Sequence, residues 1–260
     1  MEISPAGNTG ILKLKPLDIS VKDIAKKHSK KPETGFEELY IAVRQHEKKV
    51  YTDDQLKALP DFDTHSHEWE IRKQSSGRLL THLGKKHKYL NILEVGCGNG
   101  WLSAKMADMP HTDVTGLDIN HTEISQASRI FKKPNLQFVC DDFNDRTFDK
   151  ARFDVIVLAA SLQYFSSIVT VLQQALNILN RGGEIHIIDT PFYDPPEVGK
   201  AAGRCRDYYN DMGIPEMADH YFHHTISGFG GFNYRVLFNP GNLFNRIFKK
   251  EPFYWIAIYK

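Results

Sequence analysis

Residues 92–100 constrain this chain more than any other stretch, because a short apolar run, Ile-Leu-Glu-Val, leads into three glycines at alternate positions. Glycine has no Cβ, so the backbone at Gly96, Gly98 and Gly100 can turn tightly and lie against a ligand. Residues 101–107 then have the composition of a helix. This order of strand, glycine loop and helix N-terminus predicts a nucleotide-type site in an α/β fold, since free N–H groups at the helix start point at the ligand.

The spacing of the glycines indicates that the ligand is not a dinucleotide. The dinucleotide fingerprint G-x-G-x-x-G needs a third glycine where this chain has Trp101. Glu94 stands just before the loop, and its carboxylate suits an ammonium group better than a pyrophosphate. A nicotinamide dehydrogenase is therefore the function that these residues favour least.

Residues 93–100, Leu-Glu-Val-Gly-Cys-Gly-Asn-Gly, resemble the first motif of the class I S-adenosylmethionine (SAM) dependent methyltransferases. The resemblance implies an α/β fold with a doubly wound, mostly parallel sheet of seven strands, SAM as cofactor and S-adenosylhomocysteine (SAH) as product. It also implies that the loop wraps the methionine part of SAM, with Glu94 near the amino group. The cofactor contacts implied here are Glu94, Gly96, Cys97, Gly98, Asn99, Gly100 and Trp101.

Asp118 ends the second predicted strand, eighteen positions after Gly100. In doubly wound folds a carboxylate at this place accepts hydrogen bonds from ribose hydroxyls. Residues 116–120, Gly-Leu-Asp-Ile-Asn, resemble the second motif of the same family, which implies cofactor contacts from Asp118, Ile119 and Asn120, with Ile119 against the adenine. The alternative is an aspartate that caps a helix or lies on the surface.

Residues 140–143, Cys-Asp-Asp-Phe, end the third predicted strand and are similar to the third motif of the family. The resemblance implies that Asp141 or Asp142 receives the adenine amino group and that Phe143 packs on the ring. Two adjacent aspartates leave that choice open, and solvation of a loop remains the alternative.

Residues 159–164 follow the fourth predicted strand, and the resemblance places them beside the sulfonium and the methyl acceptor. Ala159 and Ser161 are the cofactor contacts predicted there. Many small-molecule members carry a histidine near Gln163, which this chain lacks, so a histidine base from this loop is in doubt. Tyr164 either orients an acceptor or packs in the core.

Trp69 and Arg72 precede the first strand by about twenty residues, in a segment that often covers the cofactor in similar enzymes. Arg72 suits the methionine carboxylate, because a guanidinium pairs with a carboxylate through two parallel hydrogen bonds. The alternative is a buried tryptophan beside an arginine whose stem lies on apolar surface.

Methyl transfer to an oxygen or nitrogen calls for a base, and several side chains are candidates. Asp189 ends the fifth predicted strand on the side of the expected site, although it also suits a hydrogen bond that holds the following turn. The catalytic residues predicted here are Tyr164, Asp189, His67 and His223, and the other candidate bases are His65, His220 and His224. No histidine or cysteine group has a recognised zinc spacing, so we expect no metal.

The composition is that of an ordinary globular enzyme: 260 residues, 41% hydrophobic, 25% charged and a net charge of +1. So small a net charge argues against a purely electrostatic nucleic-acid or membrane binder. The three cysteines are scattered and odd in number, which suits a reducing cytoplasm. We find neither a signal-peptide pattern nor an apolar run of about 20 residues, so the expected localisation is cytoplasmic with no membrane partner.

The alternation of apolar runs predicts three parts of the chain. Residues 1–65 form an arm, lysine-rich over 22–31, and a helical appendage; residues 66–260 form the SAM-binding domain; and 191–227 form an insertion or lid on the acceptor side. Helices are expected at 36–50, 52–58, 68–83, 101–107, 122–132 and 168–179, the last stopped by Arg-Gly-Gly at 181–183. Strands are expected at 91–95, 113–119, 136–140, 154–159, 184–189, 233–238 and 253–259.

The function predicted from these residues is SAM-dependent methyl transfer to a small-molecule acceptor by in-line displacement. One alternative is methylation of RNA or protein, which the lysine-rich arm keeps open although we see no N-P-P-Y type tetrapeptide and no RNA-binding module. Another is a SAM-binding module without catalysis. Either added segment suits a homodimer contact, and the motifs specify the cofactor rather than the acceptor.

Overall fold

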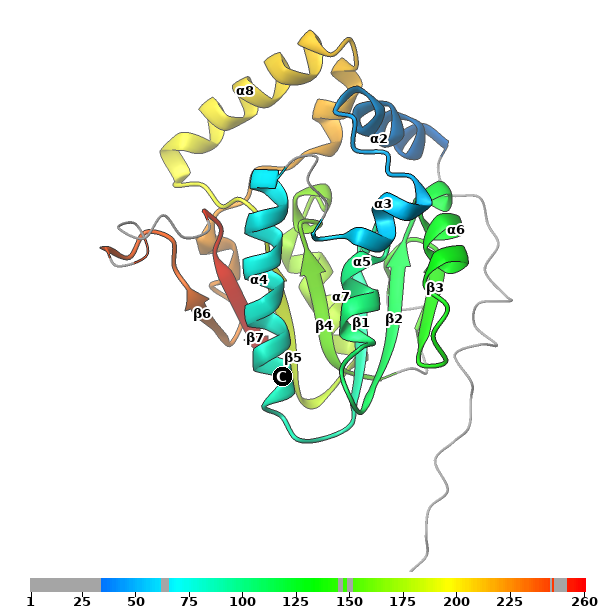
Figure 1. Ribbon diagram of the computed structural model, residues 1–260. Coiled ribbons are helices and arrows are strands. Elements are labelled where there is room, and N and C mark those ends of the chain that lie inside the picture. Colours follow the sequence, from blue (N-terminus) through cyan, green and yellow to red (C-terminus); the bar gives the residue numbers. More distant parts are fainter. Residues whose placement is uncertain (1–33, 62–65, 145–146, 149–151, 244, 246–251) are drawn as a thin grey trace, which may run out of the picture.

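The structure is a computed structural model that describes residues 34–61, 66–144, 147–148, 152–243, 245 and 252–260. These residues contain a seven-stranded sheet of order β3-β2-β1-β4-β5-β7-β6 (Figure 1). The strands are β1 (Leu90–Val95), β2 (Thr112–Asp118), β3 (Leu136–Cys140), β4 (Phe153–Ala159), β5 (Leu179–Ile188), β6 (Tyr234–Phe238) and β7 (Trp255–Tyr259). The first five strands run parallel, and β7 is antiparallel to both β5 and β6, which confirms the predicted fold class.

Helices cover both faces of the sheet and the edge at which the parallel strands end (Figure 1). They are α2 (Thr34–His46), α3 (Asp53–Ala58), α4 (Ser66–Gly84), α5 (Trp101–Met106), α6 (His121–Ile130), α7 (Ile168–Ile178) and α8 (Val198–Asp211), with 3-10 turns η1 (Leu162–Tyr164), η2 (Pro195–Glu197), η3 (Pro215–His220) and η4 (Ile226–Phe229). None of the described helices combines the length and apolar character needed to cross a bilayer.

The central strand β4 shows why the sheet is buried on both sides. Its residues Val155, Ile156, Val157 and Leu158 are all fully buried, as the unbroken apolar run predicts. Ile156 and Leu158 pack with α7 on one face, while Val155 and Val157 pack with α4 and α5 on the other. The sheet is therefore packed between two apolar layers, and the carboxyl ends of its strands remain available for a functional site.

Short-range signals set several helix ends as predicted. The Thr52 hydroxyl accepts the Gln55 backbone N–H while the Gln55 side chain accepts the Thr52 N–H, so α3 begins with a capping box. Helix α4 ends at Gly84 as expected. Helix α2 ends at His46, four residues before the predicted end, and Lys48 beyond it has a positive φ of 57°.

The predicted start of the fifth strand is wrong. The helix expected to reach residue 179 ends at Ile178, but β5 begins at Leu179 and not at the predicted residue 184. The pairing of β5 with β4 shifts register between Phe153 and Val155, so the glycine pair lies in a bulge of the strand rather than in a turn. Gly182, with φ of 75°, supplies the left-handed conformation that this bulge needs.

A third apolar cluster lies above the carboxyl edge of the sheet, where α2 and α8 cross the top of the molecule (Figure 1). Val43 on α2, Tyr209 on α8 and Met217 on η3 form its buried centre. These helices therefore roof the edge of the sheet where the sequence places the site. The lysine-rich arm at 22–31 and His65 lie outside the described residues.

Candidate functional site

The glycine loop between β1 and α5 is held against the loop that follows β4. Gly96 has a φ of 72°, and a Cβ there would lie 2.5 Å from the Cβ of Ser161. Ser161 in turn donates a hydrogen bond of 2.7 Å to the Val95 carbonyl oxygen. Only glycine therefore permits this approach, which draws the two loops into one wall.

Gly100 has a different role from the one predicted. A Cβ at Gly100 would lie 2.5 Å from the ring of Phe138 and 2.9 Å from the Cβ of Ala127, so this glycine allows β3 and α6 to pack against the start of α5. Among the cofactor contacts predicted from the motifs, Gly100 alone lines neither of the two cavities at the loop.

The first cavity lies at the ends of β1, β2 and β3, has a volume of about 210 Å³ and is called the edge cavity here. Asp118 stands at its centre: its carboxylate accepts the Gly98 N–H at 2.7 Å and the Asn120 N–H at 2.9 Å. Burial raises the pKa of Asp118, against the effect of these hydrogen bonds. The predicted residues that line this cavity are Gly96, Gly98, Asp118, Ile119, Asn120, Asp141, Asp142, Phe143, Ser161 and Tyr164.

The second cavity, called the loop cavity, lies behind the glycine loop under α2 and α4. Glu94 lines it, is 2% exposed and accepts a short hydrogen bond from the Ser103 hydroxyl. Burial raises the pKa of Glu94 to about 8, with Asp118 adding to the effect. The other predicted residues that line the loop cavity are Trp69, Arg72, Gly96, Cys97, Gly98, Asn99, Trp101 and Ala159.

Trp69 and Arg72 are fixed by neighbours on their own side of the loop cavity. The indole N–H of Trp69 donates to the Tyr51 hydroxyl at 3.0 Å, and its ring meets that of Trp101 edge-on at 5.3 Å. The Arg72 guanidinium holds Glu68 through its Nε at 3.0 Å and a terminal nitrogen at 2.9 Å. Both residues of this pair line the loop cavity. Arg72, however, already has a carboxylate partner in Glu68.

The third cavity, called the outer cavity, has a volume of about 670 Å³ and brings together all four predicted catalytic residues: His67, Tyr164, Asp189 and His223. Asp189 is 7% exposed and has a φ of 55°, which directs it from the end of β5 into the cavity. Its Oδ2 accepts a hydrogen bond of 2.9 Å from Ser75. Burial raises the pKa of Asp189 to about 6, although Arg72 lowers it.

The remaining histidines separate into three cases. His223 lies between Tyr193 and Tyr221 with its ring tilted against both and ring centroids 5.3 Å from each. His220 lies on the edge cavity instead, 5.2 Å from the ring of Phe36. His224 is buried and its Nε2 lies 3.2 Å from the Leu162 carbonyl oxygen, so this nitrogen is engaged with the backbone.

Sequence reasoning missed the contribution of α2 and α6. Tyr40 lines all three cavities, Arg44 lines the loop and outer cavities, and Glu123 lines the loop cavity. In the sequence, Tyr40 is simply one of the apolar-spaced positions of the helix predicted at 36–50. Its signal was weak, because nothing in the spacing of α2 says that the helix returns to the carboxyl edge of a sheet that begins some fifty residues later.

Buried polar atoms without hydrogen-bond partners gather at these cavities. Among the described residues, Asn120 Nδ2, Arg44 Nε, Glu123 Oε2 and Asp189 Oδ1 are such atoms. Folded proteins leave few buried polar atoms unpaired, because the desolvation cost is about 1–3 kcal/mol each. The cavities therefore offer unpaired hydrogen-bond donors and acceptors to a polar ligand. SAM, with its ribose and its amino-acid group, is a ligand of this kind.

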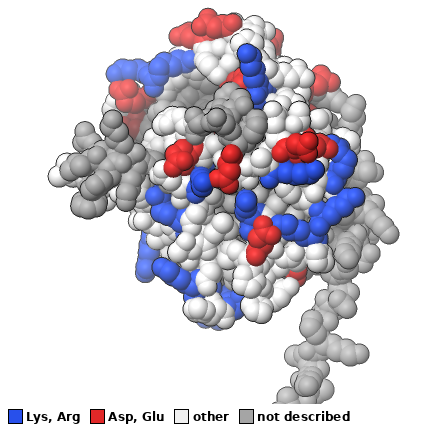
Figure 2. Space-filling model, in the orientation of Figure 1, with Lys and Arg blue, Asp and Glu red and all other residues white. Residues whose placement is uncertain are grey.

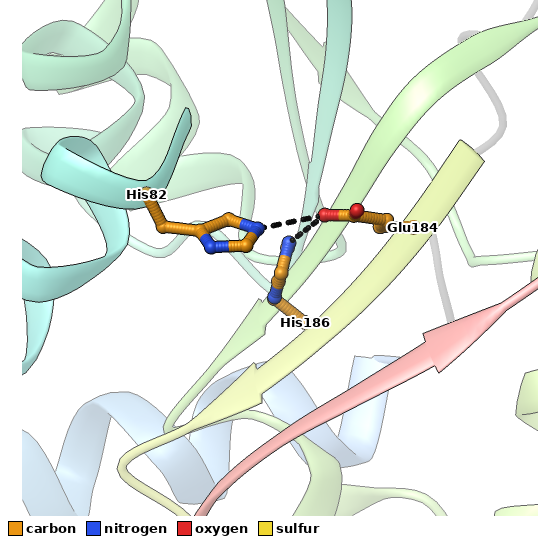
Figure 3. Close-up of side chains that lie close together, drawn as sticks. All are labelled: His82, Glu184 and His186. Atoms are coloured by element: carbon orange, nitrogen blue, oxygen red, sulfur yellow. Dashed lines mark hydrogen bonds and ion pairs between the residues drawn. The ribbon is translucent and has the colours of Figure 1, made fainter. Parts of the chain in front are cut away.

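One further cluster has the spacing of metal ligands among the described residues: His82, Glu184 and His186 (Figure 3). The Nε2 atoms of His82 and His186 lie 2.9 Å and 3.0 Å from Glu184 Oε2, and Lys86 lies 2.6 Å from Oε1. Trp255 donates to His186 Nδ1 at 3.1 Å. Neutral His186 therefore carries its proton on Nε2, where it donates to Glu184, and that nitrogen has no lone pair for a metal.

The profile of a protein family described as a methyltransferase domain matches residues 92–183, from β1 into β5. Residues 92–183 therefore form a methyltransferase domain of the class I SAM-dependent type. Its cofactor is SAM, whose methionine and adenosine parts suit the loop and edge cavities.

Among curated proteins, this chain is 28% identical over 118 residues to malonyl-[acyl-carrier protein] O-methyltransferase 1 of Ilyobacter polytropus, covering 45% of this chain and 44% of that protein. It is 31% identical over 127 residues to tRNA U34 carboxymethyltransferase of Campylobacter fetus, covering 48% and 44%. The match therefore spans less than half the length of these relatives. The structure of YjhP from E. coli shares the fold, with 16% identity, a TM-score of 0.50 and coverage of 85% of this chain and 97% of that one.

Proposed function

We propose that this methyltransferase transfers the methyl group of SAM to a small-molecule acceptor held in the outer cavity. The observation that carries the proposal is that Tyr40 and Ala160 line the edge, loop and outer cavities together. Three spaces for adenosine, methionine and acceptor thus meet at one place. When bound, SAM supplies a methyl group already activated by a sulfonium, so the protein has mainly to orient the acceptor and exclude water.

The outer cavity supports an acceptor that is small and largely uncharged. Its volume lies in the range of small-molecule sites, about 300–1,000 Å³. Two of its cations are already paired, since Lys49 holds Glu47 and Glu68 while Arg72 holds Glu68. The aromatic walls are Tyr40, Tyr164, Tyr193, Tyr208, Tyr209 and Tyr221. Such walls suit a flat or apolar body with a few hydroxyl or amine groups.

Asp189 is the residue we assign to accept a proton from the acceptor. Its Oδ1 has no hydrogen-bond partner among the described residues, while Ser75 holds Oδ2 in place. A carboxylate held at one oxygen and free at the other is oriented for general-base work. We assign orientation of the acceptor to Tyr164, His67 and His223, and we propose that residues 191–227 serve as the acceptor-side cover of a domain spanning 66–260.

Methylation of RNA is the second candidate, since one of the relatives is named for tRNA. The face of the molecule in Figure 2 carries basic and acidic side chains intermixed rather than one basic surface. Nucleic-acid binding depends on cations that neutralise phosphates, so this arrangement favours the small-molecule acceptor.

The test is a calorimetric titration with SAH, using NAD as the control ligand and Asp118→Ala as the variant. We expect SAH alone to bind, and Asp118→Ala to weaken binding about 100-fold, because two charge-assisted hydrogen bonds are lost. Asp113→Ala, at the exposed start of the same strand, is the matched control and keeps full affinity. A folded protein that binds no SAH contradicts the proposal, and SAH binding without turnover in an acceptor screen favours the non-catalytic module.

A further inference from the structure

Two side chains of opposite charge, Arg44 and Glu123, line the loop cavity. Arg44 comes from α2 and Glu123 from the first turn of α6, and each has a buried polar atom without a hydrogen-bond partner among the described residues: Nε of Arg44 and Oε2 of Glu123. Burying a charged group without a partner is costly. An unpaired donor and an unpaired acceptor in one small cavity therefore point to a ligand that carries both charges.

The position of Glu123 ties it to the glycine loop. Its Oε2 lies only 3.2 Å from where a Cβ of Gly98 would stand, so the carboxylate sits directly over the middle glycine. Burial raises the pKa of Glu123 to about 7, against the opposing effect of Arg44. A cation that binds beside this carboxylate relieves the cost of its burial.

Arg44 differs from Arg72 in what already holds it. Arg72 is tied to Glu68 by two hydrogen bonds. Arg44 instead stands 6.0 Å from the centres of the Tyr40 and Tyr51 rings, which orient the guanidinium and leave Nε free. Of the two guanidiniums at the loop cavity, Arg44 is thus the better placed to receive a new carboxylate.

We propose that Arg44 and Glu123 form a clamp for the amino-acid end of the cofactor, with Arg44 on its carboxylate and Glu123 on its ammonium, and that this clamp fixes α2 in place. The proposal rests on the proposed function, since it needs SAM or SAH in the loop cavity. Arginine suits this task because its planar fork binds a carboxylate through two parallel hydrogen bonds. Glu94, Glu68 and Arg72 also face the cavity and set its background charge.

Helix α2 lines both the loop cavity and the outer cavity, so the clamp also affects the place of the acceptor. The α2 residues Tyr40, Val43, Arg44 and Glu47 line the outer cavity. The ring of Tyr40 meets that of Tyr164 edge-on at 5.7 Å, which links α2 to the loop after β4. A cofactor that fixes α2 therefore also fixes one wall of the acceptor cavity.

The experiment compares SAH with 5′-methylthioadenosine, which keeps the adenosine and the thioether but lacks the amino-acid group. In the wild-type protein we expect SAH to bind at least about tenfold more tightly. Arg44→Gln and Glu123→Gln each remove about tenfold or more of the SAH affinity and leave the 5′-methylthioadenosine affinity within about twofold. Glu38→Gln, on the exposed side of α2, changes neither affinity.

Hydrogen exchange supplies a second readout that does not depend on turnover. SAH slows exchange of the α2 amides in the wild-type protein, whereas 5′-methylthioadenosine and the Arg44→Gln variant with SAH do not show this protection. If Arg44→Gln fails to fold, Arg44→Lys replaces it, since lysine keeps the charge but lacks the fork.

The outcomes separate the clamp from the proposed function. Equal loss of affinity for both ligands, or no loss for either, overturns the clamp while SAH binding that depends on Asp118 leaves the proposed function standing. Binding of neither ligand by the folded wild-type protein overturns both.

Discussion

Two carboxylates lie five residues apart, Glu184 half-buried within β5 and Asp189 buried just after its end, and they have opposite surroundings. Glu184 receives hydrogen bonds from His82, His186 and Lys86, so its oxygens are satisfied by the protein itself. Asp189, at the other end, is held only by Ser75 and leaves Oδ1 unpaired among the described residues. One strand thus supports a scaffold at its start and a site at its end, and completeness of hydrogen bonding distinguishes the two.

The pKa values of the two carboxyl groups follow the same division. Burial alone would raise the pKa of Glu184, but hydrogen bonds from His186, Lys86 and His82 hold it well below its ordinary range. Burial raises the pKa of Asp189 to about 6, because this carboxyl group is more deeply buried and receives a side-chain hydrogen bond from Ser75 alone among the described residues. A carboxyl group near neutrality can exchange a proton with a substrate, whereas one held ionised serves structure.

The largest effect is expected from Asp189→Asn. If Asp189 takes the proton of the acceptor, this change lowers kcat by about 10²–10⁴, while SAH affinity stays within about twofold. In the wild-type protein kcat/KM rises with pH through about 6, because the base must be deprotonated, and the variant loses this rise. The measurement is a pH series of initial rates with an acceptor found by screening.

The matched control for that rate is Asp154→Asn, at the start of β4. Asp154 accepts hydrogen bonds from the Asn91 N–H and from Asn180 at the opposite end of the sheet, so its loss lowers the free energy of unfolding and not kcat. Equal rates in wild type and Asp189→Asn would leave the base to one of the histidines of the outer cavity.

The sequence locates most residues around the edge and loop cavities because short motifs describe them. A strand, its loop and the next helix are local, so Asp118 and the glycine loop can be located from spacing alone. All predicted cofactor residues except Gly100 line the edge or loop cavity. Gly100 departs because its neighbours, Phe138 and Ala127, come from elements that the loop motif does not contain.

The contribution of α2 and α6 to the site could not be predicted from local sequence patterns. Arg44 and Glu123 meet the glycine loop only through tertiary packing of α2 and α6, and no local spacing encodes that meeting. The same holds for His82 and His186, which are about a hundred residues apart in the chain and 5.1 Å apart as rings. The wrong start predicted for β5 has another cause: a glycine pair is typical of a turn that ends a helix, whereas the pair at 182–183 forms a bulge in β5.

The second effect concerns Glu94, whose pKa burial raises to about 8 from an ordinary 4.5. The folded protein therefore keeps a proton that the unfolded chain loses, so the free energy of unfolding falls as pH rises from about 4.5 to 8. Glu94→Gln removes this penalty without changing shape. We expect it to add roughly 1–3 kcal/mol at pH 8 and almost nothing at pH 5, measured by urea unfolding.

Glu184→Gln sharpens this test because its expected sign is opposite. The pKa of Glu184 is lowered in the fold, so its ionised form stabilises above the ordinary pKa and that contribution is lost as pH falls. The variant therefore lowers stability at pH 8 and approaches the wild type in acid. A higher free energy of unfolding at pH 8 in both Glu94→Gln and Glu184→Gln would mean that the fold does not shift the pKa values of Glu94 and Glu184 in opposite directions.

The smallest effect is expected from two buried tryptophans, each of which donates one hydrogen bond through its indole N–H but in a different part of the molecule. Trp255 donates to His186 in the scaffold cluster, and Trp69 donates to Tyr51 beside the loop cavity. Each change to phenylalanine removes one buried hydrogen bond and is expected to cost about 1–2 kcal/mol of unfolding free energy. Trp69→Phe also weakens SAH binding, because Trp69 lines the loop cavity, whereas Trp255→Phe leaves the affinity unchanged in the same titration. A loss of SAH affinity in both variants would show that the scaffold cluster and the site are coupled through α4, which carries both His82 and Trp69.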